Sequence, residues 1–308
     1  MAARSLWPGR GKWDSMRLTT TIERSMEKVE DAGVLDKVSQ PLLTAVRRLT
    51  GASPAVTDLL HGVPVGHPVH PAMVLLPAGA FISASTLDFV PRTGSAVPVL
   101  IATGIATSVP AAAAGFADWS ELHPQQQRVG LVHAASNGLG VAFYAASLVA
   151  RLRGRPVSAR VLGLAGLSAI GVGGYLGGHL AYRQGAGVNH VEDVPHLVPP
   201  GWNDVCAIDD LPEGRPALQH LGDVPLLVVR RGKQIDVLSD RCSHLSGPLH
   251  EGTLSEVDGA TCVTCPWHGS TFALADGKVV RGPATVKQHS FDVRVEAGRL
   301  QVRLPHAG

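Results

Sequence analysis

The sequence predicts a multidomain protein, an all-α bundle of four transmembrane helices followed by an all-β module. Three observations support this prediction. The first two-thirds of the 308 residues are rich in Ala, Gly, Leu and Val and hold four long stretches without Asp, Glu, Lys or Arg. The last third is more charged and is typical of short strands separated by Gly-containing turns. It also holds two short loops in which a histidine closely follows a cysteine.

Residues 1–66 are predicted to form a tail and amphipathic helices. Apolar residues recur at helical spacing on a polar background, first at Ile22, Met26 and Val29 and again between residues 42 and 49. We expect Pro41 to break this segment, which leaves one or two helices lying on the membrane surface or on the β module. Residues 1–19 are expected to be disordered. Charges scattered through the first sixty residues do not fit a cleavable secretory signal.

Residues 67–182 are predicted to form a four-helix membrane domain. Crossing a bilayer takes about 20 apolar residues, and the four charge-free stretches run from Pro71 to Leu87, Thr93 to Ala117, Val129 to Ala150 and Val161 to Tyr182. A soluble bundle is the alternative, but its helices would show polar faces at helical period, and these do not. We therefore expect a multi-pass integral protein of the cell membrane, in contact with the lipid bilayer.

Histidines gather at one end of this predicted bundle. If all four stretches span, His67, His70, Asp118, His123, His133 and His179 share the end from which the β module emerges. Ionisable groups inside a membrane are costly and usually functional. Facing histidines in a helical bundle are the usual axial ligands of a b-type haem. His70, His133 and His179 are therefore candidate ligands of a haem, or line a quinone site; a purely structural role is the third alternative.

The glycines of the last predicted span bear on how it packs. Gly173 with Gly177, and Gly174 with Gly178, give the small-xxx-small spacing that admits a neighbouring helix or a flat ligand.

The arginines bear on which side of the membrane the β module lies. They concentrate in the loops at the end remote from the β module, at residues 92, 151, 153, 155 and 160. The positive-inside rule would place the β module outside, whereas the absence of a twin-arginine export motif favours the inside. The two arguments balance, and sidedness stays open.

After a predicted linker at residues 183–198, the two short loops carry Cys242-Ser-His244 and Cys265-Pro-Trp-His268. Glycine and proline beside them permit sharp turns. Two thiolates and two imidazoles can hold one iron of a cluster by sulfur and the other by nitrogen, which raises the reduction potential. The same ligands also suit a structural zinc ion, and spacing alone leaves zinc open.

The flanking residues resemble a known family. The stretches from Cys242 to Gly252 and from Val263 to Phe272 closely resemble Rieske ferredoxin-type domains, and the resemblance extends over roughly residues 199–304. It implies an all-β Rieske-type sandwich at residues 199–308 with a [2Fe-2S] cluster. By this resemblance Cys242 and Cys265 bind the inner iron, and His244 and His268 bind the outer, solvent-near iron.

Several positions depart from the respiratory members of that family. Those members carry a disulfide where this chain has Gly247 and Trp267, so no bridge is expected. Ser270 matches the hydroxyl that donates a hydrogen bond to the cluster, but Phe272 replaces a tyrosine. Losing one hydrogen bond to cluster sulfur lowers the potential, and we expect a value between the ferredoxin and respiratory extremes.

Three further features are expected in this domain. The gap between His244 and Cys265 is longer than the family suggests, which predicts an inserted hairpin at residues 256–259. The sequence Arg-Gly-Pro at 281–283 resembles the loop that shields the cluster. Cys206 and Cys262 are expected to be buried thiols and not ligands.

These elements predict an electron-transfer protein without catalytic residues of its own. It would carry single electrons between a membrane donor, a quinol or a haem b in the bundle, and a partner redox protein. The alternatives are a ferredoxin-like component serving a separate oxygenase or reductase, and a redox sensor. A net charge of +2 gives no case for nucleic acid. No Gly-rich flavin or nicotinamide fingerprint is present. Residues 60–189 also resemble an uncharacterised membrane family that is sometimes fused to Rieske domains.

Overall fold

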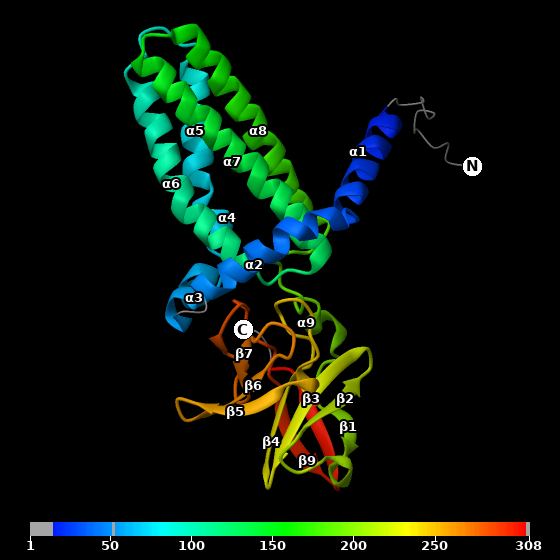
Figure 1. Cartoon of the computed structure of the whole chain (residues 1–308). Coiled ribbons are helices and arrows are strands. Elements are labelled where there is room, and N and C mark those ends of the chain that lie inside the picture. The colour runs from blue at the N-terminus through cyan, green and yellow to red at the C-terminus, as the bar shows by residue number, and fades with distance from the viewer. Residues whose placement is uncertain (1–14, 51–52, 306–308) are drawn as a thin grey trace, which may run out of the picture.

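The computed structural model describes residues 15–50 and 53–305. It divides into a helical region and a β region (Figure 1). Long helices stand side by side as a bundle, α2 (Asp36–Thr50) lies across one end of this bundle, and the β region lies beyond that same end. We call the half of the bundle nearer the β region (residues 70–77, 108–137 and 171–182) the proximal half, and the remainder the distal half.

The N-terminal helices differ from the prediction in where they break. The helices are α1 (Ser15–Glu30), α2 and α3 (Pro54–His61), with a 3-10 turn at Gly33–Leu35 between the first two. The expected break at Pro41 is wrong, because this proline lies inside α2. A proline near a helix start removes only one backbone hydrogen bond, and apolar packing of Leu43 against Trp119 of the bundle holds α2 in place.

The expected disorder of residues 1–19 is corrected in part. Helix α1 already begins at Ser15, and residues 1–14 lie outside the described residues. A salt bridge between Arg128 and Asp36, with a nitrogen–oxygen distance of 2.8 Å, ties the start of α2 to the bundle. The N-terminal helices therefore pack on the proximal end of the bundle.

The bundle has four helical spans that are long and apolar enough to cross a membrane, as predicted. They are α4 with α5 (His70–Met73 and Leu75–Leu87), α6 (Ala96–Trp119), α7 (Pro124–Leu152) and α8 (Pro156–Tyr182). Proline stands at the first position of both α7 and α8, where its missing N–H costs nothing. This explains why both helices begin about five residues earlier than the hydropathy predicted.

The distal half of the bundle has a packed aromatic core. Phe81 stacks on Tyr144 with ring centroids 4.1 Å apart, and both side chains are buried. The Tyr144 hydroxyl hydrogen-bonds the Ser85 hydroxyl at 2.6 Å. Beyond this core, Arg151 forms a short salt bridge with Asp88. The distal half is therefore filled by side chains that contact one another.

Residues 183–198 join the bundle to the β region and are not a free linker throughout. Val191 and Val194 are buried in a core of the β region, the latter in the short helix α9 (Val194–Leu197). Asp193 pairs with Arg241 at 2.7 Å. The second half of the predicted linker therefore packs as part of the β region.

The β region consists of three antiparallel sheets with strand orders β1-β10-β9, β2-β3-β4 and β5-β6-β7-β8. The strands are β1 (Asn203–Ala207), β2 (Pro216–Leu221), β3 (Val224–Arg231), β4 (Gln234–Ser239), β5 (Thr253–Val257), β6 (Ala260–Thr264), β7 (Thr271–Ala273), β8 (Val279–Arg281), β9 (Asp292–Glu296) and β10 (Arg299–Arg303). Two apolar cores lie between them, one of which includes Cys242 and Cys265. All four cysteines of the chain are free and buried, as predicted for Cys206 and Cys262.

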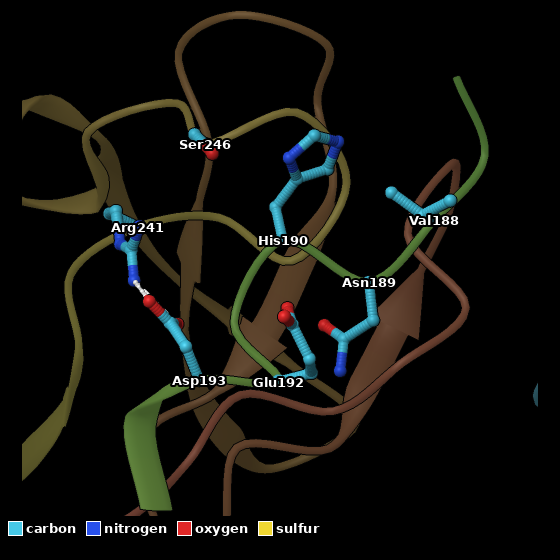
Figure 2. Close-up of a pocket in the computed structure, with 7 residues that line it drawn as sticks. All are labelled: Val188, Asn189, His190, Glu192, Asp193, Arg241 and Ser246. Atoms are coloured by element: carbon cyan, nitrogen blue, oxygen red, sulfur yellow. Dashed lines mark hydrogen bonds and ion pairs between the residues drawn. The ribbon is translucent and has the colours of Figure 1, made fainter. Parts of the chain in front are cut away.

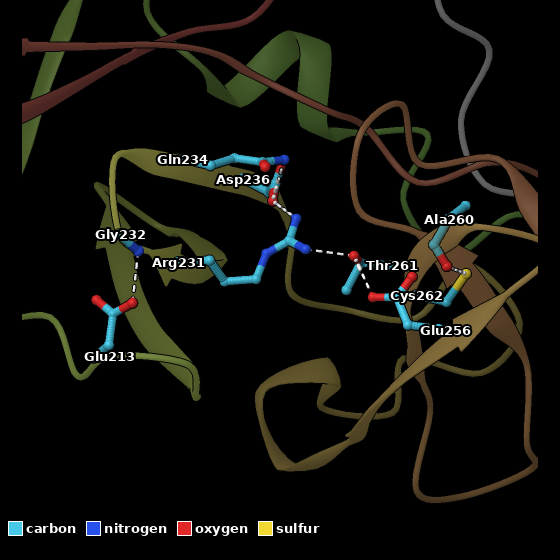
Figure 3. Close-up of polar contacts among 9 residues, drawn as sticks. All are labelled: Glu213, Arg231, Gly232, Gln234, Asp236, Glu256, Ala260, Thr261 and Cys262. Carbon is cyan, nitrogen blue, oxygen red and sulfur yellow. Dashed lines mark hydrogen bonds and ion pairs between the residues drawn. The ribbon is translucent and has the colours of Figure 1, made fainter.

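A hairpin lies between β5 and β6, at the residues 256–259 where an insertion is predicted. Asp258 and Gly259 form its turn with φ of 50° and 80°, which is typical of a tight hairpin turn. Arg231 of β3 contacts Thr261 of β6 and Asp236 of β4 (Figure 3). This arginine links the hairpin to the neighbouring sheet.

Candidate functional site

The first ligand loop follows β4 and is closed by its own backbone. The Cys242 N–H donates to the Gly247 carbonyl at 2.8 Å, and the Ser246 N–H donates to the Cys242 carbonyl at 2.8 Å. Ser246 is held in the left-handed region with φ of 61°, a conformation that costs a non-glycine residue energy. The loop therefore has a fixed, tightly turned shape.

The second ligand loop, between β6 and β7, repeats this shape. The Cys265 N–H donates to the Ser270 carbonyl at 2.8 Å, and the Gly269 N–H donates to the Cys265 carbonyl at 3.1 Å. Gly269, four residues after the cysteine like Ser246 in the first loop, has φ of 76°. Two sequences with different spacing thus form matching loops that present a cysteine and a histidine side by side.

The two cysteine side chains meet beneath the loops. Burial is nearly complete, with 1% of Cys242 and 3% of Cys265 exposed. The hydrogen bond with Cys242 lowers the pKa of Cys265 to about 7, helped by the Trp267 and His268 backbone N–H groups. The same hydrogen bond and burial raise the pKa of Cys242. One thiolate is therefore already favoured, and metal binding would displace the remaining proton.

The two histidine side chains meet on the outer side of the loops. The ring centroids of His244 and His268 are 5.1 Å apart. Burial lowers the pKa of His244 to about 3, and the neighbouring histidines, including His61, add to this effect. Its Nδ1 atom is buried without a hydrogen-bond partner, which would cost about 1–3 kcal/mol if nothing bound there. Neutral imidazole with an unpaired nitrogen is the form that binds a metal.

The arrangement fits a two-iron cluster better than zinc. The ligands separate into a thiol pair and an imidazole pair, and within residues 15–50 and 53–305 no three His, Cys, Asp or Glu side chains converge on one ion. A structural zinc ion requires four ligands that converge. Cys242, His244, Cys265 and His268, the four predicted ligands, thus lie together in pairs as a cluster requires.

Residues around the pairs seal the site. A Cβ at Gly247 would lie only 2.7 Å from the Cys265 sulfur and 3.2 Å from the Trp267 ring, so only glycine fits there. The buried Ser270 hydroxyl accepts a hydrogen bond from the Ala284 N–H at 3.0 Å. Its own proton stays available for a cluster sulfur, as the prediction requires. Phe272 is fully buried below the loops.

The His244 and His268 rings form one edge of this site, which we call the imidazole edge. This edge faces the proximal end of the bundle. The His123 ring lies 5.8 Å from the His268 ring and 5.7 Å from the Trp267 ring. The Gly282 N–H donates to the Asp58 carboxylate of α3 at 2.9 Å. Sequence reasoning put His123 at this end of the bundle but missed its contact with the ligand loop.

A second contact that the sequence did not predict joins His61 to Asp118, at the same boundary between the helical region and the β region. The His61 side chain is only 3% exposed, and its Nδ1 is 2.9 Å from the Asp118 carboxylate of α6. The sequence signal for it was the Leu-His-Gly at residues 60–62, where Gly62 adopts φ of 85° and ends α3. This pair links α3 to the end of α6 beside His244.

The structure separates the three candidate histidines of the bundle. The His70 and His133 rings face each other with centroids 6.3 Å apart. His179 instead places its Nε2 2.8 Å from the Glu30 carboxylate of α1. Of the three, His70 and His133 form a pair, and His179 contacts the N-terminal helix.

A polar pocket of about 500 Å³ lies beside the first ligand loop. Its lining residues come from the linker and from that loop, and are Val188, Asn189, His190, Glu192, Asp193, Arg241 and Ser246 (Figure 2). The hydrogen bond from Arg241 lowers the pKa of the Asp193 carboxyl. The ion pair of Arg241 with Asp193 therefore ties the linker to the start of the first ligand loop.

Comparison with known proteins separates the same two regions. Residues 201–292 match the Rieske [2Fe-2S] domain family, and residues 66–190 match a family described as a predicted membrane protein, DUF2231. Ferredoxin CarAc of Metapseudomonas resinovorans is 36% identical over 102 residues, which cover 33% of this chain and 92% of that protein. The 3-phenylpropionate/cinnamic acid dioxygenase ferredoxin subunit of Escherichia coli (strain K12) has the same identity and coverage.

A similar solved structure is the ferredoxin of carbazole 1,9a-dioxygenase from Nocardioides aromaticivorans IC177. Its sequence identity is 24% and its TM-score is 0.31, over 34% of this chain and 98% of that one. The two ferredoxin sequences above cover about a third of this chain, as expected if they lack its membrane domain. The chain therefore belongs to the Rieske [2Fe-2S] ferredoxin-type family through its β region, which is joined to a DUF2231 membrane domain.

Proposed function

We propose that this Rieske ferredoxin-type carrier spans the membrane four times and exchanges single electrons between its membrane domain and its cluster. In this proposal Cys242 and Cys265 hold the inner iron, and His244 and His268 hold the outer iron. The bound cluster supplies the one-electron chemistry. The polypeptide excludes water, keeps the two imidazoles neutral, places the two cysteine sulfurs side by side and orients the imidazole edge.

The contact between the imidazole edge and the bundle is the observation that carries this proposal. His268 packs against His123, and the Gly282 N–H binds Asp58, so both the second ligand loop and the loop after β8 touch the helical region. A cluster carried only as a soluble module would have no need for this contact. A one-electron path into the membrane domain requires it, because electron transfer needs the two centres close together.

The donor side is proposed to be a quinol or a haem of the membrane domain, and the acceptor a separate redox protein. That protein would approach the part of the edge left open beside Trp267, which is 49% exposed. The alternative is a ferredoxin component that serves a separate oxygenase or reductase. The 36% identity to a ferredoxin named as a dioxygenase subunit favours it.

The test measures the rate at which a short-chain quinol reduces the cluster of the full chain in lipid vesicles, followed by electron paramagnetic resonance. His123→Ala and Asp58→Ala weaken the contact between the regions. We expect each to slow reduction about tenfold, which corresponds to about 1.4 kcal/mol in the barrier. His196→Ala is the control, because this exposed histidine of α9 lies away from the contact.

Cys265→Ser provides the baseline, since losing a thiolate ligand should abolish the cluster signal. Unchanged quinol reduction in both contact variants would refute the internal electron path. If quinol never reduced the cluster while a soluble reductase reduced it rapidly, the ferredoxin alternative would replace the proposal.

A further inference from the structure

The His70 and His133 side chains are held in the same way by two different helices of the proximal half, α6 and α8. The His70 Nδ1 lies 2.8 Å from the Ala111 carbonyl of α6, and the His133 Nδ1 lies 2.7 Å from the Gly173 carbonyl of α8. A carbonyl only accepts, so each Nδ1 carries the proton. Each Nε2 is then unprotonated, which is the metal-binding form of a neutral imidazole. The Asn137 amide lies 3.3 Å from the His133 Nε2 and 3.4 Å from its Nδ1, and it donates to the His133 backbone carbonyl at 2.9 Å. A ligand at His133 would therefore displace this amide from the ring nitrogen.

Each of the two rings lies directly against a glycine of a neighbouring helix. A Cβ at Gly115 of α6 would lie 2.7 Å from the His70 ring, and a Cβ at Gly177 of α8 would lie 3.1 Å from the His133 ring. Both positions therefore require small residues. This explains one of the glycines of α8 that the sequence singled out, Gly177, whereas Gly173 lies against the Asn137 side chain.

The two apolar clusters found in the described helical region are centred elsewhere. The buried cluster of the bundle is built around Phe81, Ile101 and Tyr144 of the distal half. The cluster at Trp119 lies against α2, at the end of the bundle. The groups that contact the two rings are instead the glycines Gly115 and Gly177, the Ala111 and Gly173 carbonyls and the Asn137 amide. Small residues allow a flat group to approach a helix closely.

From this arrangement we propose that His70 and His133 are the two axial ligands of a b-type haem. Axial imidazoles on one iron have ring centres roughly 6 Å apart, given a metal–nitrogen distance of about 2 Å. The observed separation is 6.3 Å. A lone ion would need more ligands, yet no third His, Cys, Asp or Glu joins the pair in the described chain. A porphyrin itself supplies the four remaining nitrogens.

The haem site stands on this geometry alone, whereas its role as electron donor rests on the proposed function. In that role a ferrous haem would give one electron to the oxidised cluster and become ferric. Helix α6 connects the two sites. Its Ala111 carbonyl holds His70, and its Asp118 holds His61, which lies beside His244.

The test uses the full chain, purified in detergent with its cluster and titrated with haemin. We expect one haem per chain, a sharp α band after dithionite reduction and a low-spin ferric resonance spectrum. His70→Ala and His133→Ala should each remove the low-spin signal and weaken haem binding at least tenfold. His179→Gln, which changes the third candidate histidine, on α8, should keep both the haem and the low-spin signal.

Rescue separates a ligand from a merely structural histidine. His133→Gly should regain the low-spin spectrum when free imidazole is added, and the cluster resonance in each variant shows that the chain is folded. Wild-type protein that binds no haemin, or alanine variants that keep the low-spin spectrum, would overturn the proposal, as would bound quinone in place of haem. Protein that binds haem at this pair, but whose reduced haem is not oxidised by the cluster, would uphold the site and refute only the proposed function.

Discussion

The two halves of the membrane bundle are built from the same helices but are filled differently. In the distal half, Phe81 and Tyr144 stack, and Asp88 pairs with Arg151. The proximal half holds a pair of histidines set against glycines, and its end faces the N-terminal helices and the Rieske domain. One half is closed by its own side chains, whereas the other presents polar groups toward other parts of the protein.

This difference separates stability from function. Stable packing needs only apolar side chains that fill space, and the distal half meets that need. Histidines in the proximal half add little packing, and their burial is costly unless they bind a partner. We therefore expect variants of the distal half to lower the free energy of unfolding, and variants of the proximal half to affect ligand binding and domain contact.

The largest effect on stability is expected from Tyr144→Ala in the distal half. Tyr144 is fully buried, and its loss removes the stacking with Phe81 and leaves a cavity. The expected decrease in unfolding free energy is about 3–5 kcal/mol, measured by reversible denaturation in detergent micelles. His133→Ala in haem-free protein should cost less than about 2 kcal/mol. Equal losses of unfolding free energy in the two variants would contradict the difference between the distal and proximal halves.

Ion pairs at the two ends provide a second test. Asp88→Asn leaves the Arg151 charge without its partner where only 14% of that side chain is exposed, and should cost about 3 kcal/mol. The proximal pair of Arg47 and Glu121 is the matched control, since the arginine is 50% exposed. Glu121→Gln should cost less than about 1 kcal/mol. A larger loss at the proximal pair would contradict this ranking.

A smaller effect is expected where the proximal end is anchored by single contacts. The Trp119 indole N–H donates to the Gln127 carbonyl at 2.8 Å, and a phenylalanine there would remove this hydrogen bond between the end of α6 and the start of α7. We expect Trp119→Phe to lower the unfolding free energy by about 1–2 kcal/mol. Hydrogen exchange should rise in α2, which packs on this tryptophan. Faster exchange in the distal half instead would count against a local anchor.

The smallest effect concerns pH. The hydrogen bond from Arg128 lowers the pKa of the Asp36 carboxyl in the folded protein. Its contribution is therefore complete above the unfolded value of about 3.9 and is lost as pH falls through the lower folded value. Hydrogen exchange of α2 should quicken over that acidic range, and Asp36→Asn should remove the dependence. A dependence centred near neutral pH would point to another group.

Local patterns in the chain were sufficient to predict most elements. Runs without charge predicted the four spans, and two Cys-His loops predicted the paired ligands. The excess length between the loops predicted the β5–β6 hairpin. Each of these signals depends on neighbours in the sequence, through hydropathy over about 20 residues or through ligand spacing within a turn. The break at Pro41 was mispredicted because tertiary packing on Trp119 holds α2 together across it.

Contacts between remote segments could not be predicted in the same way. The pairing of His61 with Asp118, the approach of His123 to His268 and the direction of His179 toward Glu30 all depend on how α1–α3 cross the bundle end. The folding of residues 191–198 onto the β region likewise follows from a core built by distant strands.

The sequence by itself determined that this protein has a membrane domain and a Rieske cluster site, because hydropathy and ligand chemistry are properties of short segments. Only the tertiary structure decided which histidines face one another and that the imidazole edge docks on the bundle. Those relations depend on the crossing of helices and loops that lie far apart in the chain, and no local pattern encodes them.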